Sequence, residues 1–221
     1  MQLVQRQNTS TRRLFGFAGV FCAVFVWTLV SFSQRPMISE LRTKGVPVDS
    51  VLFITHSQSQ VAGRGYPERL PMANYWEPAQ LPDNWDGNRK GFSGYVWYRL
   101  EVPQKVRTWH RPTLYVPAAG MNAELWLNGR RVDGAGRMTG QVSRHFYTPQ
   151  LMEIPPALLE ESNEMYLLVV GYPGYRCGLA PVWLGEHDAL FDAWRQRRFW
   201  QVEGNAATIV INLSMAVFVL L

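Results

Sequence analysis

The chain has little cysteine and no histidine spacing that suits a metal. Its 221 residues include two cysteines, Cys22 and Cys177. Cys22 lies within a long hydrophobic run, so the two are not expected to meet, and a folded domain must rely on its core. The four histidines are scattered, with no pair at metal-ligand spacing. These absences exclude a disulfide-stapled scaffold, and they lead us to expect no metal and no cofactor.

Catalytic motifs are also missing. The glycine-rich run Gly134–Gly140 (GAGRMTG) has its third glycine one residue late for a dinucleotide loop, and it follows a hairpin signal. Ser93 lacks the spacing of a nucleophile elbow. The carboxylates Glu160, Glu161 and Glu164 stand in a polar run that is typical of a solvated surface. We therefore expect that this segment is not an enzyme.

The excess of positive charge is small once the N-terminal residues are set apart. The chain has 22 Lys/Arg against 17 Asp/Glu, a net charge of +5. Arg6, Arg12 and Arg13 precede the first hydrophobic run, and the 19 basic residues that remain nearly balance the 17 acidic ones. This excludes a nucleic-acid binder, whose basic residues would gather on the domain. The basic flank is instead typical of a cytoplasmic N-terminus.

Two hydrophobic runs carry no charge. Leu14–Phe32 has about 19 residues, close to the ~20 that a helix needs to cross a bilayer, and predicts a transmembrane anchor. A cleaved signal peptide is the alternative, because Ser31 and Ser33 stand at cleavage spacing. Ala206–Leu221, about 16 residues, predicts the start of a second membrane helix in a longer parent protein. A buried C-terminal helix or a tail anchor is the other interpretation.

These runs divide the chain into parts. We expect a cytoplasmic tail at 1–13 and an anchor or signal at 14–32. An extracytoplasmic domain follows at 33–188, with its core at about 45–185. A juxtamembrane segment at 189–205 then leads into a truncated membrane helix at 206–221. Residues 33–204 would then lie in the periplasm, with the protein in a bacterial inner membrane. The bilayer is a predicted partner, and a homodimer through the membrane helices is another. Arg195, Arg197 and Arg198 weigh against this topology, because positive charge prefers the cytoplasmic side.

Strand patterns dominate the segment between the runs. Tyr95–Val102 (YVWYRLEV) alternates as a half-buried strand does. Ala123–Leu127 alternates too, and Asn128-Gly129 after it is a strong hairpin signal, since both turn residues need positive φ. Further strands are predicted at Val51–Thr55, Thr113–Val116, Met165–Val170 and Ala180–Leu184, with one helical turn at Pro156–Glu161. The set predicts an all-β antiparallel sandwich.

Several of these segments form an ordered series of motifs. LPDNW at 81–85, GYVWYRL at 94–100 and AELWLNG at 123–129 are followed by Asn163 and YLLVV at 166–170. The series resembles the galactose-binding-like jelly roll at the N-terminus of family 2 glycoside hydrolases. It is also similar to the related jelly-roll sensor domains of bacterial receptors with a seven-helix membrane module. The resemblance covers about residues 75–185 and implies a jelly-roll topology.

The membrane context favours the receptor. A family 2 hydrolase would continue into an immunoglobulin-like domain and a catalytic barrel, whereas this chain runs through an aromatic segment into a hydrophobic run. The resemblance thus implies an extracytoplasmic ligand-sensing domain of a signal-transduction receptor, the N-terminal part of a sensor histidine kinase. One alternative is a carbohydrate-binding accessory domain of a membrane-tethered glycosidase. Another is a sandwich that binds a partner protein and no small ligand.

Candidate ligand-binding residues stand in three loop-like stretches. Aromatic faces stack on sugar rings, and arginine bonds to hydroxyls, so these residue types predict a site for a small molecule or saccharide. The candidates are Trp85, Arg89, Arg137, Arg144, Tyr172, Tyr175 and Arg176. For Trp85, packing against the sandwich is the alternative. Trp97 and Trp126 are expected to cover the opposite sheet face, and Arg99 to pair with Glu101 or Glu124.

Overall fold

The computed structural model describes residues 50–71, 75–146, 148–175, 177–204 and 209–214. Residues 50–202 belong to one compact unit. The predicted membrane run 14–32 and most of 206–221 lie outside the described residues. Among the described helices, none is long and apolar enough to cross a bilayer. Residues 209–214 form a short helical segment.

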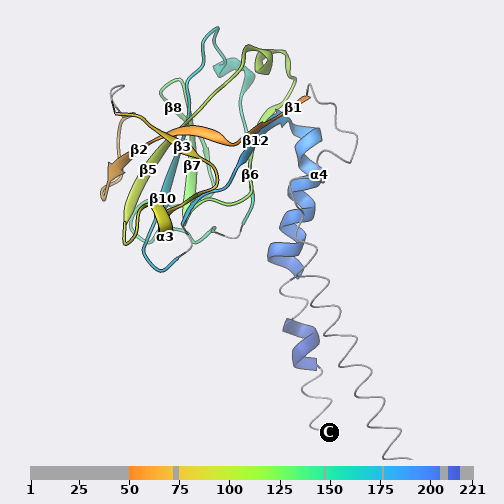
Figure 1. The fold of residues 1–221 in the computed structure, drawn as a ribbon. Coiled ribbons are helices and arrows are strands. Elements are labelled where there is room, and N and C mark those ends of the chain that lie inside the picture. Colours follow the sequence, from red (N-terminus) through yellow and green to blue (C-terminus); the bar gives the residue numbers. More distant parts are fainter. Residues whose placement is uncertain (1–49, 72–74, 147, 176, 205–208, 215–221) are drawn as a thin grey trace, which may run out of the picture. The chain divides into compact units, whose positions relative to one another are not determined.

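Two antiparallel sheets form a sandwich, as predicted (Figure 1). The four-stranded sheet has, in spatial order, β1 (Val51–Ile54), β12 (Val182–Glu186), β6 (Pro112–Val116) and β9 (Gln150–Glu153). The six-stranded sheet has β3 (Glu77–Gln80), β2 (His56–Gly63), β5 (Gly94–Leu100), β10 (Met165–Gly171), β7 (Asn122–Leu127) and β8 (Arg130–Gly134). The short strands β4 (Asp83–Asn84) and β11 (Gly178–Leu179) pair separately.

The order in which the chain visits the two sheets defines the topology. Setting aside β2 and β3 at one edge, and the short pair β4 and β11, leaves eight strands. Numbered along the chain, the first, eighth, third and sixth form one sheet, and the second, seventh, fourth and fifth form the other. This is the winding of a jelly roll, in which two Greek keys span two sheets.

Cross-strand rows place the core between the sheets. Leu52, Leu184, Leu114 and Met152 align across the four-stranded sheet; the last three are buried in the main core, and Leu52 packs against it. The alternate row points the opposite way and consists of Phe53, Trp183, Tyr115 and Leu151. Because side chains alternate along a strand, a sheet that is apolar on both faces needs a second cover.

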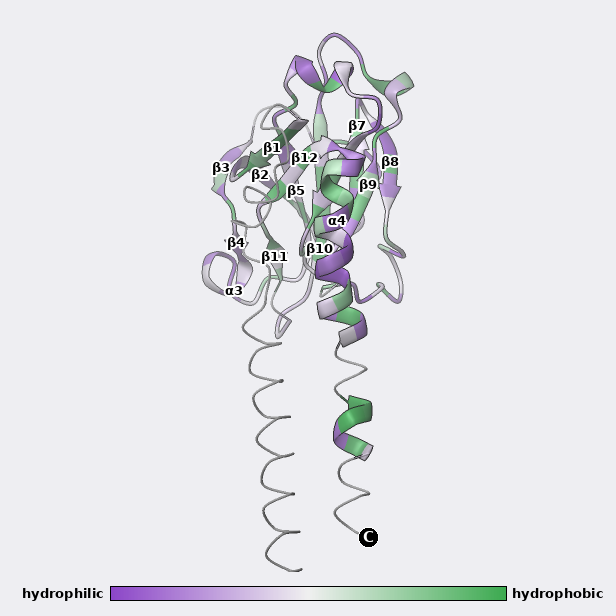
Figure 2. Ribbon diagram, turned by 90° about the vertical axis from the view of Figure 1, so that its right-hand side faces the viewer, coloured by the Kyte–Doolittle hydropathy of each residue, from purple (hydrophilic) through white to green (hydrophobic). Residues whose placement is uncertain are grey.

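Helix α4 (His187–Arg198) supplies that cover on the outer face of the four-stranded sheet (Figures 1 and 2). Leu190 is fully buried against Tyr115 and Trp183. The indole Nε1 of Trp194 donates a hydrogen bond to the carbonyl of Pro149, at 2.9 Å. The first part of the predicted juxtamembrane segment is therefore a helix packed on the sandwich, followed by a π-helical turn, Phe199–Glu203.

The prediction that β5 is half-buried was wrong. Every one of its residues except Arg99 is buried. On the face turned away from the other sheet, Trp97 and Trp126 meet edge to face, with ring centroids 5.6 Å apart, as expected of a pair covering that face. Trp76 stacks on Tyr166, at 5.5 Å, and closes the face from the segment before β3. Local alternation does not reveal such a distant cover.

The other predicted strands are found within one or two residues of their predicted ends. Asn128 and Gly129 have φ of 49° and 79°, which confirms the hairpin. The predicted helical turn is a 3-10 turn, Pro156–Leu158, and a second one, Gln104–Thr108, was not predicted. Arg99 pairs with Glu164 at 3.3 Å, and neither expected partner was right.

Candidate ligand-binding site

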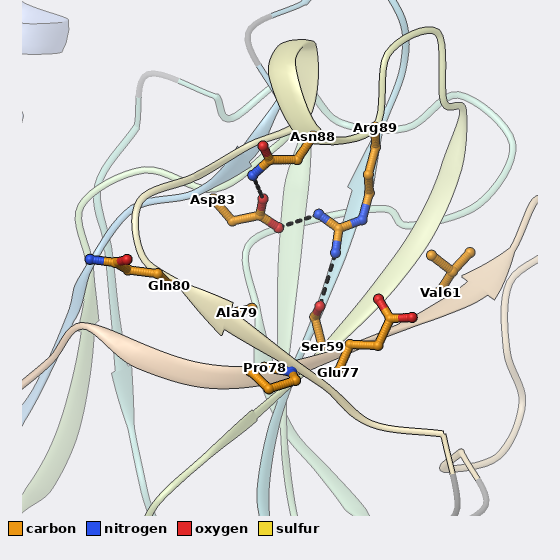
Figure 3. Close-up of a pocket in the computed structure, with 9 residues that line it drawn as sticks. All are labelled: Ser59, Val61, Glu77, Pro78, Ala79, Gln80, Asp83, Asn88 and Arg89. Atoms are coloured by element: carbon orange, nitrogen blue, oxygen red, sulfur yellow. Dashed lines mark hydrogen bonds and ion pairs between the residues drawn. The ribbon is translucent and has the colours of Figure 1, made fainter.

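A pocket of about 400 Å³ lies at the β2–β3 edge of the six-stranded sheet, facing β4 and the one-turn helix α3 (Trp85–Asn88) (Figure 3). That volume is within the range of roughly 300–1,000 Å³ for small-molecule sites. Its lining consists of Ser59, Val61, Glu77, Pro78, Ala79, Gln80, Asp83, Asn88 and Arg89. All but Val61, Pro78 and Ala79 have side chains that can form hydrogen bonds. Of the predicted site residues, Arg89 lines this pocket directly.

Asp83 forms the buried base of this site, with its side chain 3% exposed. Its Oδ2 accepts a hydrogen bond from the hydroxyl of Tyr98 at 2.6 Å and pairs with Nη1 of Arg89. Its Oδ1 accepts from Nδ2 of Asn88 at 2.9 Å. Both carboxylate oxygens are thus occupied, as burial of a charge requires. We infer that Asp83 holds Arg89 in place and is not a free base.

Trp85 supports this network from beneath. It is 2% exposed, and its Nε1 donates to the hydroxyl of Tyr98 at 2.7 Å. Burial, and next the negative charge of Asp83, raise the pKa of Tyr98 well above its ordinary value. Tyr98 therefore remains a proton donor to Asp83 at any physiological pH. Trp85 follows the alternative considered for it and packs against the sandwich, so its ring is not available for stacking on a sugar.

The local backbone places Asp83 at the pocket base. Asn84 caps α3, accepting a hydrogen bond from the amide of Asp86 at 3.1 Å. Strand β4 lies directly against β11, where Gly178 has φ of 147° and a Cβ would meet the carbonyl oxygen of Asp83 at 1.9 Å. Only glycine allows this approach. The pairing of β4 with β11 thus fixes the start of α3, and with it the positions of Asn88 and Arg89 beside Asp83.

Arg89 and Glu77 are the two ionisable side chains that line the open part of the pocket. Nη2 of Arg89 donates to Oγ of Ser59 at 2.9 Å, which leaves the Ser59 proton for a further bond. The arginine side chain is 16% exposed, so it is held on its inner side and open on its outer side. Figure 3 shows the Glu77 carboxylate on the same side of β2 and β3 as Ser59 and Arg89. Within the described residues, Glu77 has no ion pair or hydrogen bond through its side chain.

A second group of predicted residues meets elsewhere on the domain. The guanidinium of Arg144 lies 5.6 Å from the ring centroid of Tyr175, and Phe146 lies 5.9 Å from the same ring. Tyr172 begins the same loop, where its carbonyl accepts from the thiol of Cys177 at 3.5 Å. We call Arg144, Phe146, Tyr172 and Tyr175 the aromatic loop cluster.

One further predicted residue, Arg137, makes contacts that involve neither group. Arg137 is exposed, and its backbone amide donates to Oγ of Ser143 at 3.0 Å, which closes the loop after β8. Arg176 lies outside the described residues. The predicted set is therefore not one site: the structure brings Trp85 and Arg89 into one network and Arg144 and Tyr175 into another.

Sequence reasoning missed Ser59, Glu77, Asp83 and Tyr98. Ser59 and Glu77 belong to strands whose polar composition, such as HSQSQVAG in β2, hides their strand character. Tyr98 stands in an apolar strand and gives no sign of a polar partner. Asp83 was visible in LPDNW, where a carboxylate two residues before a buried tryptophan could have suggested a buried pair. Among the described residues, no group of three His, Cys, Asp or Glu could hold a metal ion.

No family model matches this chain, and no curated protein matches it. The fold is similar to parts of several solved enzymes. A β-glucuronidase of Faecalibacterium prausnitzii is 14% identical, with a TM-score of 0.47 over 62% of this chain and 32% of that one. A family 2 glycosyl hydrolase of Bacteroides cellulosilyticus is 16% identical, with a TM-score of 0.46 over 62% and 20%. The β-glucuronidase of Ruminococcus gnavus is 13% identical, with a TM-score of 0.44 over 61% and 28%.

The chain thus spans about a third or less of the length of these enzymes. At such identities the similarity is one of fold alone.

Proposed function

We propose that the domain binds a hydroxyl-rich small molecule, a saccharide, in the pocket between β2–β3 and β4–α3, without transforming it. The observation that carries the proposal is the fixed position of Arg89. Its guanidinium is held by Asp83 and Ser59 on the inner side, and the pocket lies on its outer side. A donor group that is already immobilised loses little entropy when a ligand binds.

The chemistry of the lining suits hydroxyl groups. Each sugar hydroxyl both donates and accepts, so it is best matched by neighbouring donors and acceptors. Arg89 donates, Glu77 accepts, and the hydroxyl of Ser59 and the amide of Asn88 can do both.

The setting of the domain is the wider part of the proposal. We propose an extracytoplasmic module of an inner-membrane receptor, and the uncharged runs at 14–32 and 206–221 support it. The packing of α4 on the sandwich adds support, because a helix fixed to the domain can pass a shift in population toward the residues that follow. A carbohydrate-binding accessory domain of a membrane-tethered glycosidase would use the same pocket. Further hydrophobic runs in a longer parent would favour the receptor, and barrel strands would favour the glycosidase.

Calorimetric titration tests the binding. The full chain, in a detergent without a sugar headgroup, is titrated with neutral monosaccharides such as galactose. The double variant Glu77→Ala, Asn88→Ala removes two pocket contacts, and we expect at least about a tenfold loss of affinity. Gln58→Ala is the matched control, since Gln58 is an exposed residue of β2 on the opposite sheet face. Equal affinity for both variants would overturn the proposed site.

A further inference from the structure

The charges of the pocket do not cancel. Its lining contains two carboxylates, Asp83 and Glu77, and one guanidinium, Arg89. Asp83 and Arg89 form a close ion pair, and each is otherwise bonded inside the domain. Glu77 is exposed and has no partner among the described residues. The pocket therefore carries one unpaired negative charge beside a neutralised arginine.

We propose that this unpaired charge selects the sugar: the pocket prefers an amino sugar to a neutral one, and disfavours a uronic acid. This inference rests on the proposed function and adds the substrate class to it. The ammonium group of an amino sugar would pair with the Glu77 carboxylate at the pocket mouth. The carboxylate of a uronic acid would meet the same charge and be repelled.

Arg89 does not reverse this preference. An arginine that recognises a carboxylate uses two parallel N–H donors, and here one terminal nitrogen already serves Asp83 and the other serves Ser59. A ligand carboxylate could reach only the remaining donors, and it would share the cation with a buried carboxylate 3% exposed. The paired guanidinium acts on a ligand as a hydrogen-bond donor with little net charge.

The neighbouring wall does not restore a positive charge. Ser59, Asn88 and Gln80 are neutral, while Val61, Pro78 and Ala79 are apolar. In Figure 3 Glu77 extends from β3 beside Val61, and the ion pair lies deeper, toward α3. An ammonium substituent near β3 therefore meets an acceptor that is not already engaged.

Three probes of one ring stereochemistry test the inference: galactose, galactosamine and galacturonate, titrated at low salt into the full chain in a detergent without a sugar headgroup. We expect galactosamine to bind about two- to fivefold more tightly than galactose, as exposed ion pairs do, and galacturonate to bind more weakly. In Glu77→Gln the three affinities should converge. Glu101→Gln, which removes an exposed carboxylate at the end of β5, should keep the wild-type order.

The outcomes separate the two ideas. If none of the three sugars binds, the proposed function fails and the inference fails with it. If the three bind equally, or galacturonate binds best, the charge selection is overturned while saccharide binding stands. If Glu77→Gln keeps the wild-type order, the selection does not come from Glu77 and the inference is likewise overturned.

Discussion

Two buried carboxylates in this domain have the same kinds of partner and different surroundings. Asp83 accepts from the hydroxyl of Tyr98 and pairs with Arg89, and Glu124 accepts from the hydroxyl of Tyr66 at 2.8 Å and pairs with Nε of Arg131 at 2.9 Å. The carboxylate side chains are 3% and 4% exposed. The arginines differ, since Arg89 is 16% exposed and Arg131 is 49% exposed.

The difference shows two uses of one arrangement. Around Glu124, the partners lie over the outer face of the six-stranded sheet, and the bond from Tyr66 ties the loop after β2 down onto that face. Around Asp83, the network lies behind a pocket and holds an arginine at its wall. A buried carboxylate is thus weak evidence of a site by itself. The distinguishing observation is that the arginine held by Asp83 lines a pocket.

The largest expected effect is on Asp83. Asp83→Ala leaves Arg89 without its charge partner and Tyr98 without its acceptor, and we expect a loss of about 3–5 kcal/mol in the free energy of unfolding. Glu124→Ala should cost about 1–3 kcal/mol, because the half-exposed Arg131 can return to water. Urea unfolding followed by tryptophan fluorescence measures both. An equal or larger loss for Glu124→Ala would show that exposure of the arginine does not set the cost.

The tyrosines that bond to the two carboxylates should contribute less to stability than the carboxylates do. Tyr98→Phe removes the acceptor of the Trp85 indole and a donor to Asp83, so we expect a loss of about 1–3 kcal/mol. Tyr66→Phe removes one bond, and we expect about 0.5–1.5 kcal/mol. Saccharide affinity should fall in Tyr98→Phe and stay unchanged in Tyr66→Phe. A fall in affinity in Tyr66→Phe would link the outer face to the pocket and break the comparison.

Alkaline pH gives the smallest effect. Burial, then the hydrogen bond to Glu124 and its charge, raise the pKa of Tyr66 from 10.0 to about 12. Between these values the unfolded chain loses the proton and the folded one keeps it, so stability present below pH 10 is lost as pH rises toward 12. Other buried tyrosines contribute to the same slope, so the wild type is compared with Tyr66→Phe. The variant should show a shallower decline in unfolding midpoint, and an identical decline would contradict the assignment.

Local patterns predicted the sandwich and much of its core, because alternation in segments such as Ala123–Leu127 and the Asn128-Gly129 turn act over a few residues. They did not predict β2 and β3, since Ser59 and Glu77 stand in polar edge strands that gain their structure from pairing with β5 and with each other. The pocket is lined by residues between Ser59 and Arg89, which are far apart in the sequence. No short sequence pattern therefore predicts the Asp83 network or the pocket beside it. Arg144 and Tyr175 were predicted as candidates in two separate stretches, and the structure brings them together with Phe146, which was not predicted.

A crystal structure of the chain grown with galactosamine would test the central claim most directly. We expect electron density for the sugar between Ser59, Glu77 and Arg89, with its nitrogen toward the Glu77 carboxylate. Density at the aromatic loop cluster, beside Tyr175 and Arg144, with the pocket filled by water alone, would contradict it.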